Sequence, residues 1–62
     1  MKNNLKKIRR RNRETQIELA AAIRVTPQTI IALERNHRSP SLWVAKRLED
    51  YYGETIFFDD ND

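Results

Sequence analysis

The sequence contains no cysteine, one glycine, two prolines and one histidine. Without cysteine, the chain has no disulfide, no thiolate zinc site and no redox dithiol, so helix packing or self-association must stabilise it. No segment approaches the roughly 18 apolar residues of a membrane helix, and no apolar stretch follows the basic N-terminus as it does in an export signal. We therefore expect a cytoplasmic protein with no membrane partner.

The small size and the single glycine also argue against catalysis. A chain of 62 residues buries only about 60% of its unfolded surface, which allows one domain and leaves no room for a substrate cleft. The sequence offers no Ser-His-Asp or Cys-His set and no glycine-rich phosphate loop. His37 lies in a polar segment without ligand partners, so we expect it to face solvent or phosphate. We expect no enzyme activity, no metal and no cofactor.

Acidic residues are scarce over most of the chain. Residues 1–47 hold all twelve Lys and Arg but only three acidic residues, a net charge of +9, whereas residues 48–62 hold six Asp and Glu and no basic residue. A body this basic attracts a polyanion through phosphate contacts and counterion release. A solvated charged surface explains the same composition equally well, so charge alone does not decide the function.

Capping signals divide residues 3–53 into four short helices. Thr15 followed by Glu18 matches a capping box, in which each side chain satisfies a backbone donor. Thr26 followed by Pro27 marks another helix start, because proline suits the first helical position. The other signals are the N-cap residues Asn3 or Asn4 and Ser41, and a left-handed exit at Gly53. The expected helices span about residues 4–11, 15–24, 26–35 and 41–52.

The apolar residues of these helices predict one core. The expected core positions are Leu5, Ile8, Leu19, Ala20, Ile23, Val25, Ile30 and Leu33, followed by a stripe of Leu42, Ala45, Leu48 and Tyr52. Trp43 lies one position off this stripe, and we expect it to be partly buried against the preceding loop rather than to contact DNA or a partner. Residues 56–58 follow as an extended segment or a turn or two of helix, and the acidic residues 59–62 are expected to fray.

The second and third helices form a recognisable pair. Only residues 24–26 separate them, and this spacing sets the later helix steeply across the earlier one. Ala20 lies where the two helices cross and must be small. Because the core residues hold one side of helix 26–35, its opposite side stays free to enter a DNA major groove. The sequence therefore predicts a helix-turn-helix motif at residues 16–35.

Residues 15–42, TQIELAAAIRVTPQTIIALERNHRSPSL, closely resemble the Cro and phage-repressor family of helix-turn-helix regulators. The likeness extends from about Leu5 to Phe57 and includes Gln16, Leu19, Ala20, Val25, Thr29, Ile30, Glu34, Asn36 and Pro40. It implies an all-α, lambda-repressor-like bundle of four to five short helices over residues 1–58. It also implies a nucleoid-associated bacterial or phage repressor that binds palindromic operator DNA as a homodimer without a cofactor.

The resemblance assigns roles to individual residues. The residues it places on DNA phosphates are Gln16, Thr26, Asn36 and Arg38, which position the protein without specifying sequence. The residues it places on base edges are Pro27, Gln28, Ile31 and Ala32, with Thr29 and Arg35 at the margins. Because the Gln28 amide can pair bidentately with adenine, we expect A·T-containing half-sites. Arg9 and Glu34 correspond to a structural ion pair of the family.

The chain departs from the family pattern at three points. Glu14 stands where the family has a large apolar residue, so this corner is either open to solvent or filled by Ile17. Arg24 replaces the usual glycine of the turn, where a left-handed conformation is costly, so either the turn differs slightly or the charge is directed toward DNA. After Gly53 little chain remains for a fifth helix.

The C-terminal aromatic residues suggest self-association. Four of the five aromatic residues lie at positions 51–58, and so small a domain cannot bury them all. We expect some in the core and predict a dimer interface formed by Tyr51, Tyr52, Ile56, Phe57 and Phe58. The alternative is a protein-interaction module with the same fold, such as an antitoxin or adaptor, and an operator-binding protein could also meet a toxin or anti-repressor. The basic body and the polar free face of helix 26–35 favour double-stranded DNA.

Overall fold

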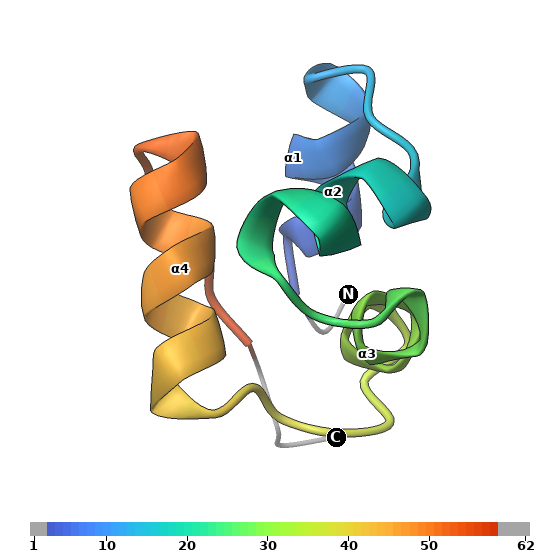
Figure 1. The fold of residues 1–62 in the computed structure, drawn as a ribbon. Helices are drawn as coiled ribbons and strands as arrows, with labels where there is room; N and C mark the ends of the chain where they lie inside the picture. Colours follow the sequence, from blue (N-terminus) through green and yellow to red (C-terminus); the bar gives the residue numbers. More distant parts are fainter. Residues whose placement is uncertain (1–2, 59–62) are drawn as a thin grey trace.

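The computed structural model describes residues 3–58 and contains four helices, α1 (Leu5–Arg11), α2 (Gln16–Ile23), α3 (Pro27–Glu34) and α4 (Leu42–Tyr52) (Figure 1). This confirms the expected all-α bundle of short helices. The acidic residues 59–62, which were expected to fray, lie outside the described residues. None of the helices within residues 3–58 has the length and apolar character that a membrane crossing requires.

Local capping explains where the later helices begin and end. The Thr15 hydroxyl accepts the Glu18 N–H at 3.0 Å, and the Glu18 carboxylate accepts the Thr15 N–H at 2.8 Å, which completes the capping box. Thr26 and Ser41 each accept an N–H from the first turn of the helix they cap. Gly53 ends α4 in the left-handed region with φ of 70°. The capping prediction is confirmed at these positions.

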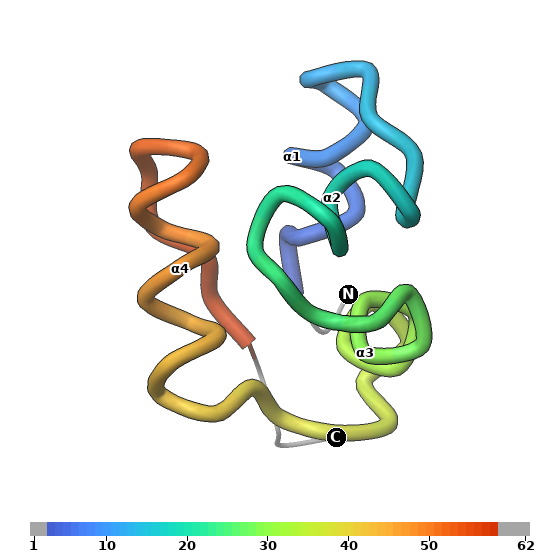
Figure 2. Tube along the Cα trace, viewed as in Figure 1, coloured from blue at the N-terminus to red at the C-terminus, as the bar shows by residue number. Residues whose placement is uncertain are grey.

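At the N-terminus, the two predicted cap residues divide the role between them. Asn4 occupies the N-cap position of α1 but makes no side-chain capping bond. The Asn3 side-chain oxygen instead accepts the Leu5 N–H at 3.0 Å. Asn3 also forms an isolated antiparallel bridge with Phe58, and the Phe57 N–H donates to the Asn4 side-chain oxygen at 3.0 Å. The C-terminal segment is therefore extended along the N-terminus, and no fifth helix forms within residues 3–58 (Figure 2).

The core lies where α1, α2 and α3 meet, and α4 covers one side of it (Figure 1). Burial of each large apolar side chain contributes about 1.5–3 kcal/mol relative to exposure. Ala20, at the crossing of α2 and α3, is only 1% exposed, so a larger side chain there would overpack the core. The buried apolar residues are Leu5, Ile8, Leu19, Ala20, Ile23, Ile30, Leu33, Leu48 and Ile56.

Two predictions for α4 are wrong. Leu42 is 85% exposed and Trp43 is 73% exposed, so neither belongs to the buried side of the helix. Val44, Leu48 and Tyr52 repeat every four residues and pack against the core instead. At 100° per residue, Leu42 lies about 120° and Trp43 about 140° around the helix from Leu48. The Trp43 ring is accompanied by the Arg47 guanidinium, 5.8 Å from its centroid.

Candidate nucleic-acid interface

The structure anchors α3 through one side and leaves parts of the other side accessible. Ile30 and Leu33 are almost completely buried and fix the helix to the domain. Gln28 and Arg35 are exposed on the remaining surface, and the other residues predicted to read bases, Pro27, Thr29, Ile31 and Ala32, are half-buried. The free face is therefore narrower than the sequence suggested, because Ile31 and Ala32 present only part of their side chains.

The residues predicted to bind phosphates lie at both ends of the motif. Gln16 is the first residue of α2, and its amide donates to Glu34 Oε1 at 3.0 Å. Thr26 is exposed before α3, and its hydroxyl lies 3.1 Å from the Thr29 hydroxyl. Arg38 is exposed in the loop after α3. Along the chain, these side chains therefore stand before and after α3.

Asn36 occupies a left-handed position with φ of 58° immediately after the C-cap of α3. Its side-chain oxygen accepts a hydrogen bond from Asn3 at 3.0 Å, and the same Asn3 amide donates to the Leu33 carbonyl at 2.8 Å. Asn3 is only 3% exposed. The sequence predicted Asn3 only as a helix-capping residue and did not reveal that its side chain joins the N-terminus to the end of α3. No local signal links residues this far apart.

Arg9 and Glu34 form a buried ion pair beneath the motif. Arg9 Nε lies 2.6 Å from Glu34 Oε2, and the two side chains are 9% and 3% exposed. The hydrogen bond to Glu34 raises the pKa of Arg9 above its usual value, against the opposing effect of burial. Arg9 Nη1 also donates to the Glu14 carbonyl at 2.6 Å. One guanidinium thus connects α1, the turn before α2 and the end of α3.

The corner at Glu14 is not filled by Ile17, which is 68% exposed, and the Glu14 side chain is half-buried there. Two tyrosines at the end of α4 bind its carboxylate. The Tyr52 hydroxyl donates to Glu14 Oε1 at 2.7 Å, and the Tyr51 hydroxyl donates to Oε2. Burial and the bond to Glu14 raise the pKa of Tyr52, and the bond to Glu14 raises that of Tyr51. Of the two alternatives drawn from the sequence for this corner, filling by Ile17 is therefore wrong, whereas the half-buried Glu14 does remain partly open to solvent.

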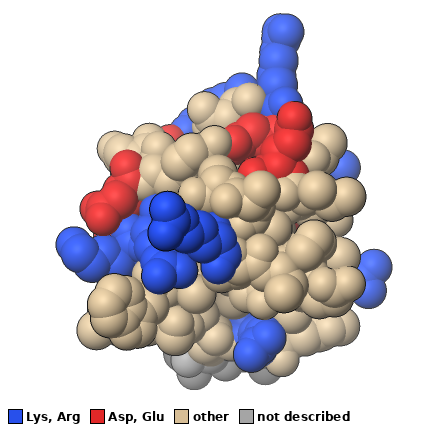
Figure 3. Space-filling model, viewed as in Figure 1, with Lys and Arg blue, Asp and Glu red and all other residues tan. Residues whose placement is uncertain are grey.

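The turn between α2 and α3 contains a strained arginine. Arg24 caps α2 in the left-handed conformation, with φ of 63° and ψ of 47°. Arg47 Nη1 donates to the Ile23 carbonyl at 3.2 Å and so helps to satisfy the end of α2. Figure 3 shows Lys and Arg side chains clustered on the side where α4 lies. The positive charge is therefore not confined to the α3 surface.

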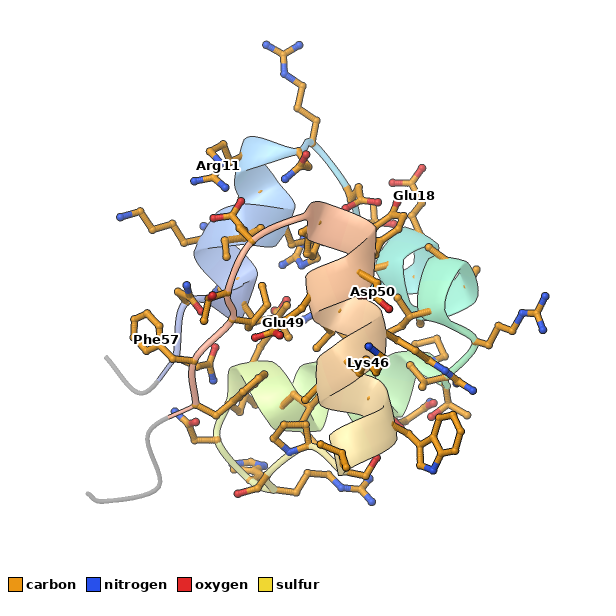
Figure 4. All side chains as sticks on the ribbon, turned by 90° about the vertical axis from the view of Figure 1, so that its left-hand side faces the viewer. Arg11, Glu18, Lys46, Glu49, Asp50 and Phe57 are labelled. Atoms are coloured by element: carbon orange, nitrogen blue, oxygen red, sulfur yellow. The ribbon has the colours of Figure 1, made fainter. Side chains whose placement is uncertain are left out.

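The proposed dimer residues do not all lie at the surface. Ile56 is only 6% exposed and belongs to the core, so its assignment to an interface is wrong. Tyr52 and Phe58 are half-buried against that core. Tyr51 and Phe57 remain 46% and 58% exposed, and Phe57 projects from the edge of the domain (Figure 4).

Known proteins with similar sequences are helix-turn-helix regulators. A helix-turn-helix family model matches residues 5–58. The chain is 40% identical over 65 residues to an uncharacterized HTH-type transcriptional regulator of Methanocaldococcus jannaschii, covering 100% of this chain and 98% of that relative. It is 50% identical over 52 residues to another of Methanothermobacter thermautotrophicus, covering 77% of this chain and 75% of that relative. Both organisms are archaea, so these relatives give no support to the bacterial or phage origin expected above.

Proposed function

Because the chain belongs to the helix-turn-helix family of transcriptional regulators, we propose that it is a repressor that binds a palindromic operator as a homodimer. Membership of this family makes the chain a DNA-binding regulator. What we propose beyond this is repression, the two-fold operator and the homodimer. The observation that carries it is the presentation of α3, which is anchored by Ile30 and Leu33 and exposes Gln28. A helix held in this way fits the major groove.

Base reading centres on Gln28. Its exposed amide can donate to and accept from one adenine edge, whereas Pro27, Ile31 and Ala32 offer apolar contact to a thymine methyl group. Thr29 and Arg35 contribute at the margins of the half-site. This composition favours A·T-containing half-sites.

Phosphate contacts at both ends of the motif position α3. Gln16, Thr26, Asn36 and Arg38 fulfil this role, and Glu34 holds the Gln16 amide at the start of α2. Such contacts fix register on the duplex and affect all sequences alike.

Pairing of two copies would place two α3 helices about one helical turn, roughly 34 Å, apart on one side of the duplex. The exposed residues Tyr51 and Phe57, with the accessible parts of Tyr52 and Phe58, are the proposed contact surface. Aromatic side chains bury a large area at low entropic cost, which suits a small interface.

The first experiment is selection of duplexes from a random DNA pool at near-physiological salt. Enrichment of an inverted repeat with half-sites about 10 bp apart supports a dimeric operator-binding protein. A promoter-reporter assay carrying that repeat then distinguishes repression from activation. Absence of enrichment would favour the second candidate, an antitoxin or adaptor. The observation that favours this candidate is the exposed Leu42 and Trp43 pair outside the α3 surface.

Two substitutions separate the proposed roles. Gln28→Ala should cost about 1–3 kcal/mol on the selected operator and relax sequence preference at one position. Arg38→Ala should weaken binding to all duplexes and flatten the salt dependence by about one unit of slope. Equal losses on operator and random duplex for both variants would contradict these assignments.

A further inference from the structure

Half of the basic residues of the chain lie in one short segment. Residues 6–13, Lys-Lys-Ile-Arg-Arg-Arg-Asn-Arg, hold six of the twelve Lys and Arg and no acidic residue. Two of the six have partners, since Arg9 pairs with the buried Glu34 and Arg11 pairs with Glu54 at the surface. The other four are exposed and take part in no ion pair within residues 3–58. These four, which we call the α1 basic face, are Lys6, Lys7, Arg10 and Arg13.

The α1 basic face is unfavourable for the helix that carries it. Lys6 and Lys7 lie in the first turn of α1, which contains no acidic residue, and the positive end of the helix dipole repels cations there. Lys6 and Arg10 are four residues apart, so two like charges lie side by side and destabilise the helix. A surface that only needed to be solvated would mix charges of both signs. A bound anion removes both kinds of repulsion.

The α1 basic face lies on a different side of the domain from the surface proposed for the operator. Leu5 and Ile8 are buried and direct one side of α1 into the core, so the basic side faces outward. In Figure 4, the end of α1 marked by Arg11 lies at the upper edge of the domain, and α3 lies along the lower edge. The domain extends 28 × 20 × 19 Å, more than twice the Debye length of about 8 Å. A duplex on α3 therefore leaves cations of α1 available.

The composition of this face favours a nucleic acid over a protein. The exposed residues between Lys6 and Arg13 are all Lys, Arg or Asn, so the face lacks the apolar or aromatic centre of a protein interface. Its spacing also fits a phosphate backbone. The seven residues of α1 span about 10.5 Å, and the phosphates of one DNA strand follow each other about every 3.4 Å along the axis. The helix thus matches about three successive phosphates.

We propose that the α1 basic face binds the phosphate backbone of a second DNA duplex while α3 occupies the operator, so that the protein bridges two DNA segments. The inference rests on the proposed function for the first duplex and adds a separate surface for the second. Contact with the second duplex goes to phosphates alone, so it does not depend on sequence and weakens as salt is added.

The test compares two variants with the same loss of charge. The basic-face variant carries Lys6→Gln and Arg10→Gln. The control variant carries Lys46→Gln and Arg47→Gln, which remove two exposed cations from α4. Both lower the net charge by two, and neither changes a residue assigned to the operator. Circular dichroism checks that both variants keep their helices, so a difference between them reports the position of the charge.

The selected operator is immobilised, saturated with protein and washed, and capture of a labelled random duplex is measured from 50 to 300 mM KCl. Each phosphate contact contributes a salt slope of about 0.9, or about 5-fold over this range. Loss of two contacts should therefore weaken capture by the basic-face variant about 25-fold at 50 mM and little at 300 mM. The control should capture the duplex as the wild type does. Affinity for the operator itself should stay within about 2-fold in both variants at 150 mM, because screening limits the effect of distant charges.

Three results would overturn the inference. The first is an equal loss of capture in the two variants. The second is no capture by the wild type, whether or not the basic-face variant binds the operator more weakly. The third is capture of a polyglutamate peptide in place of the duplex, which would favour an acidic protein partner.

Amide NMR separates failure of this inference from failure of the proposed function. Addition of a random duplex to the operator-bound protein should shift the signals of residues 6–13 and leave those of α3 unchanged. If the selection yields no operator, the same titration is made on the free protein. Shifts at residues 6–13 would then still support a DNA contact at the α1 basic face, and their absence would overturn it.

Discussion

Glu34 and Glu14 are carboxylates near the same arginine, and the fold satisfies them in opposite ways. Glu34 is 3% exposed at the side chain and is held by the Arg9 guanidinium and by Gln16. The Glu14 carboxylate is bound by two neutral tyrosine hydroxyls at the edge of the domain. A buried charge requires an opposite charge, whereas an accessible carboxylate is stable with hydrogen bonds alone. The two sites should therefore respond differently to loss of a partner.

The largest effect is expected at the buried site. Glu34→Ala should lower the free energy of unfolding by about 3–5 kcal/mol, because it leaves the Arg9 guanidinium buried without its counter-charge. Urea unfolding monitored by the fluorescence of the single tryptophan measures this loss. The double variant Arg9→Met/Glu34→Leu should recover most of the stability, since no charge remains buried. A loss below about 1 kcal/mol in Glu34→Ala would remove the distinction between the two sites.

At the Glu14 site the expected loss is smaller. Tyr52→Phe should cost about 1.5 kcal/mol, because the half-buried hydroxyl donates to a charged acceptor. Tyr51→Phe should cost about 0.5 kcal/mol or less, since that hydroxyl is more exposed and water replaces its bond. The same unfolding assay measures both variants, and a loss at Tyr52 equal to that of Glu34→Ala would contradict the comparison.

The tyrosine site also predicts a pH dependence. The pKa of Tyr52 is raised in the folded state above the ordinary value of about 10 that applies in the unfolded chain. Its contribution to stability is therefore fully present below pH 10 and is lost as the pH rises further. Wild-type stability should fall faster than that of Tyr52→Phe between about pH 10 and 11. Parallel curves would show that ionisation of Tyr52 is not linked to folding.

The two sites should differ in their effect on DNA binding as well. Gln16→Ala should weaken binding to all duplexes by about 1 kcal/mol, because Glu34 holds that amide at the phosphate position. The salt slope should not change, since a neutral amide releases no counterion. Glu14→Gln serves as the control, because the Glu14 side chain binds the two tyrosines and not Glu34 or Gln16. An equal loss of affinity in Glu14→Gln would show that both sites support the DNA surface.

The smallest effect is expected at Arg24, whose exposed charge does not balance a buried group. Arg24 and Gly53 both end helices in the left-handed conformation. Arg24→Gly should stabilise the domain by about 0.5–1 kcal/mol, because glycine adopts this conformation without strain. Gly53→Ala should cost a similar amount, and nothing within 4 Å would contact the added methyl group. A loss of stability in Arg24→Gly would indicate that its charge stabilises the fold after all.

The local features of the fold could be predicted from the sequence. The caps at Thr15, Thr26, Ser41 and Gly53 were predicted correctly because each depends on residues within one helical turn. The end of α3 fell one residue earlier than expected, at Glu34.

The errors concern how distant segments meet. Leu42 and Trp43 were placed near the core because their helix phase was judged from apolar residues alone, whereas the rotation of α4 is set by its packing on α2. The bonds from Tyr51 and Tyr52 to Glu14 join residues 37 and 38 positions apart. No spacing rule within one helix predicts such contacts, and Ile56 proved to be core for the same reason.

The bridge between Asn3 and Phe58 bears on how the chain folds and opens. The Asn4 to Phe57 hydrogen bond beside it spans 53 residues, whereas the helices form from contacts within a few residues. Closing so long a loop is entropically costly, so this contact should form last and open first. Hydrogen exchange should begin at the two ends together. A short peptide linker joining the ends would remove that closure cost, slow local opening and leave the helices unchanged.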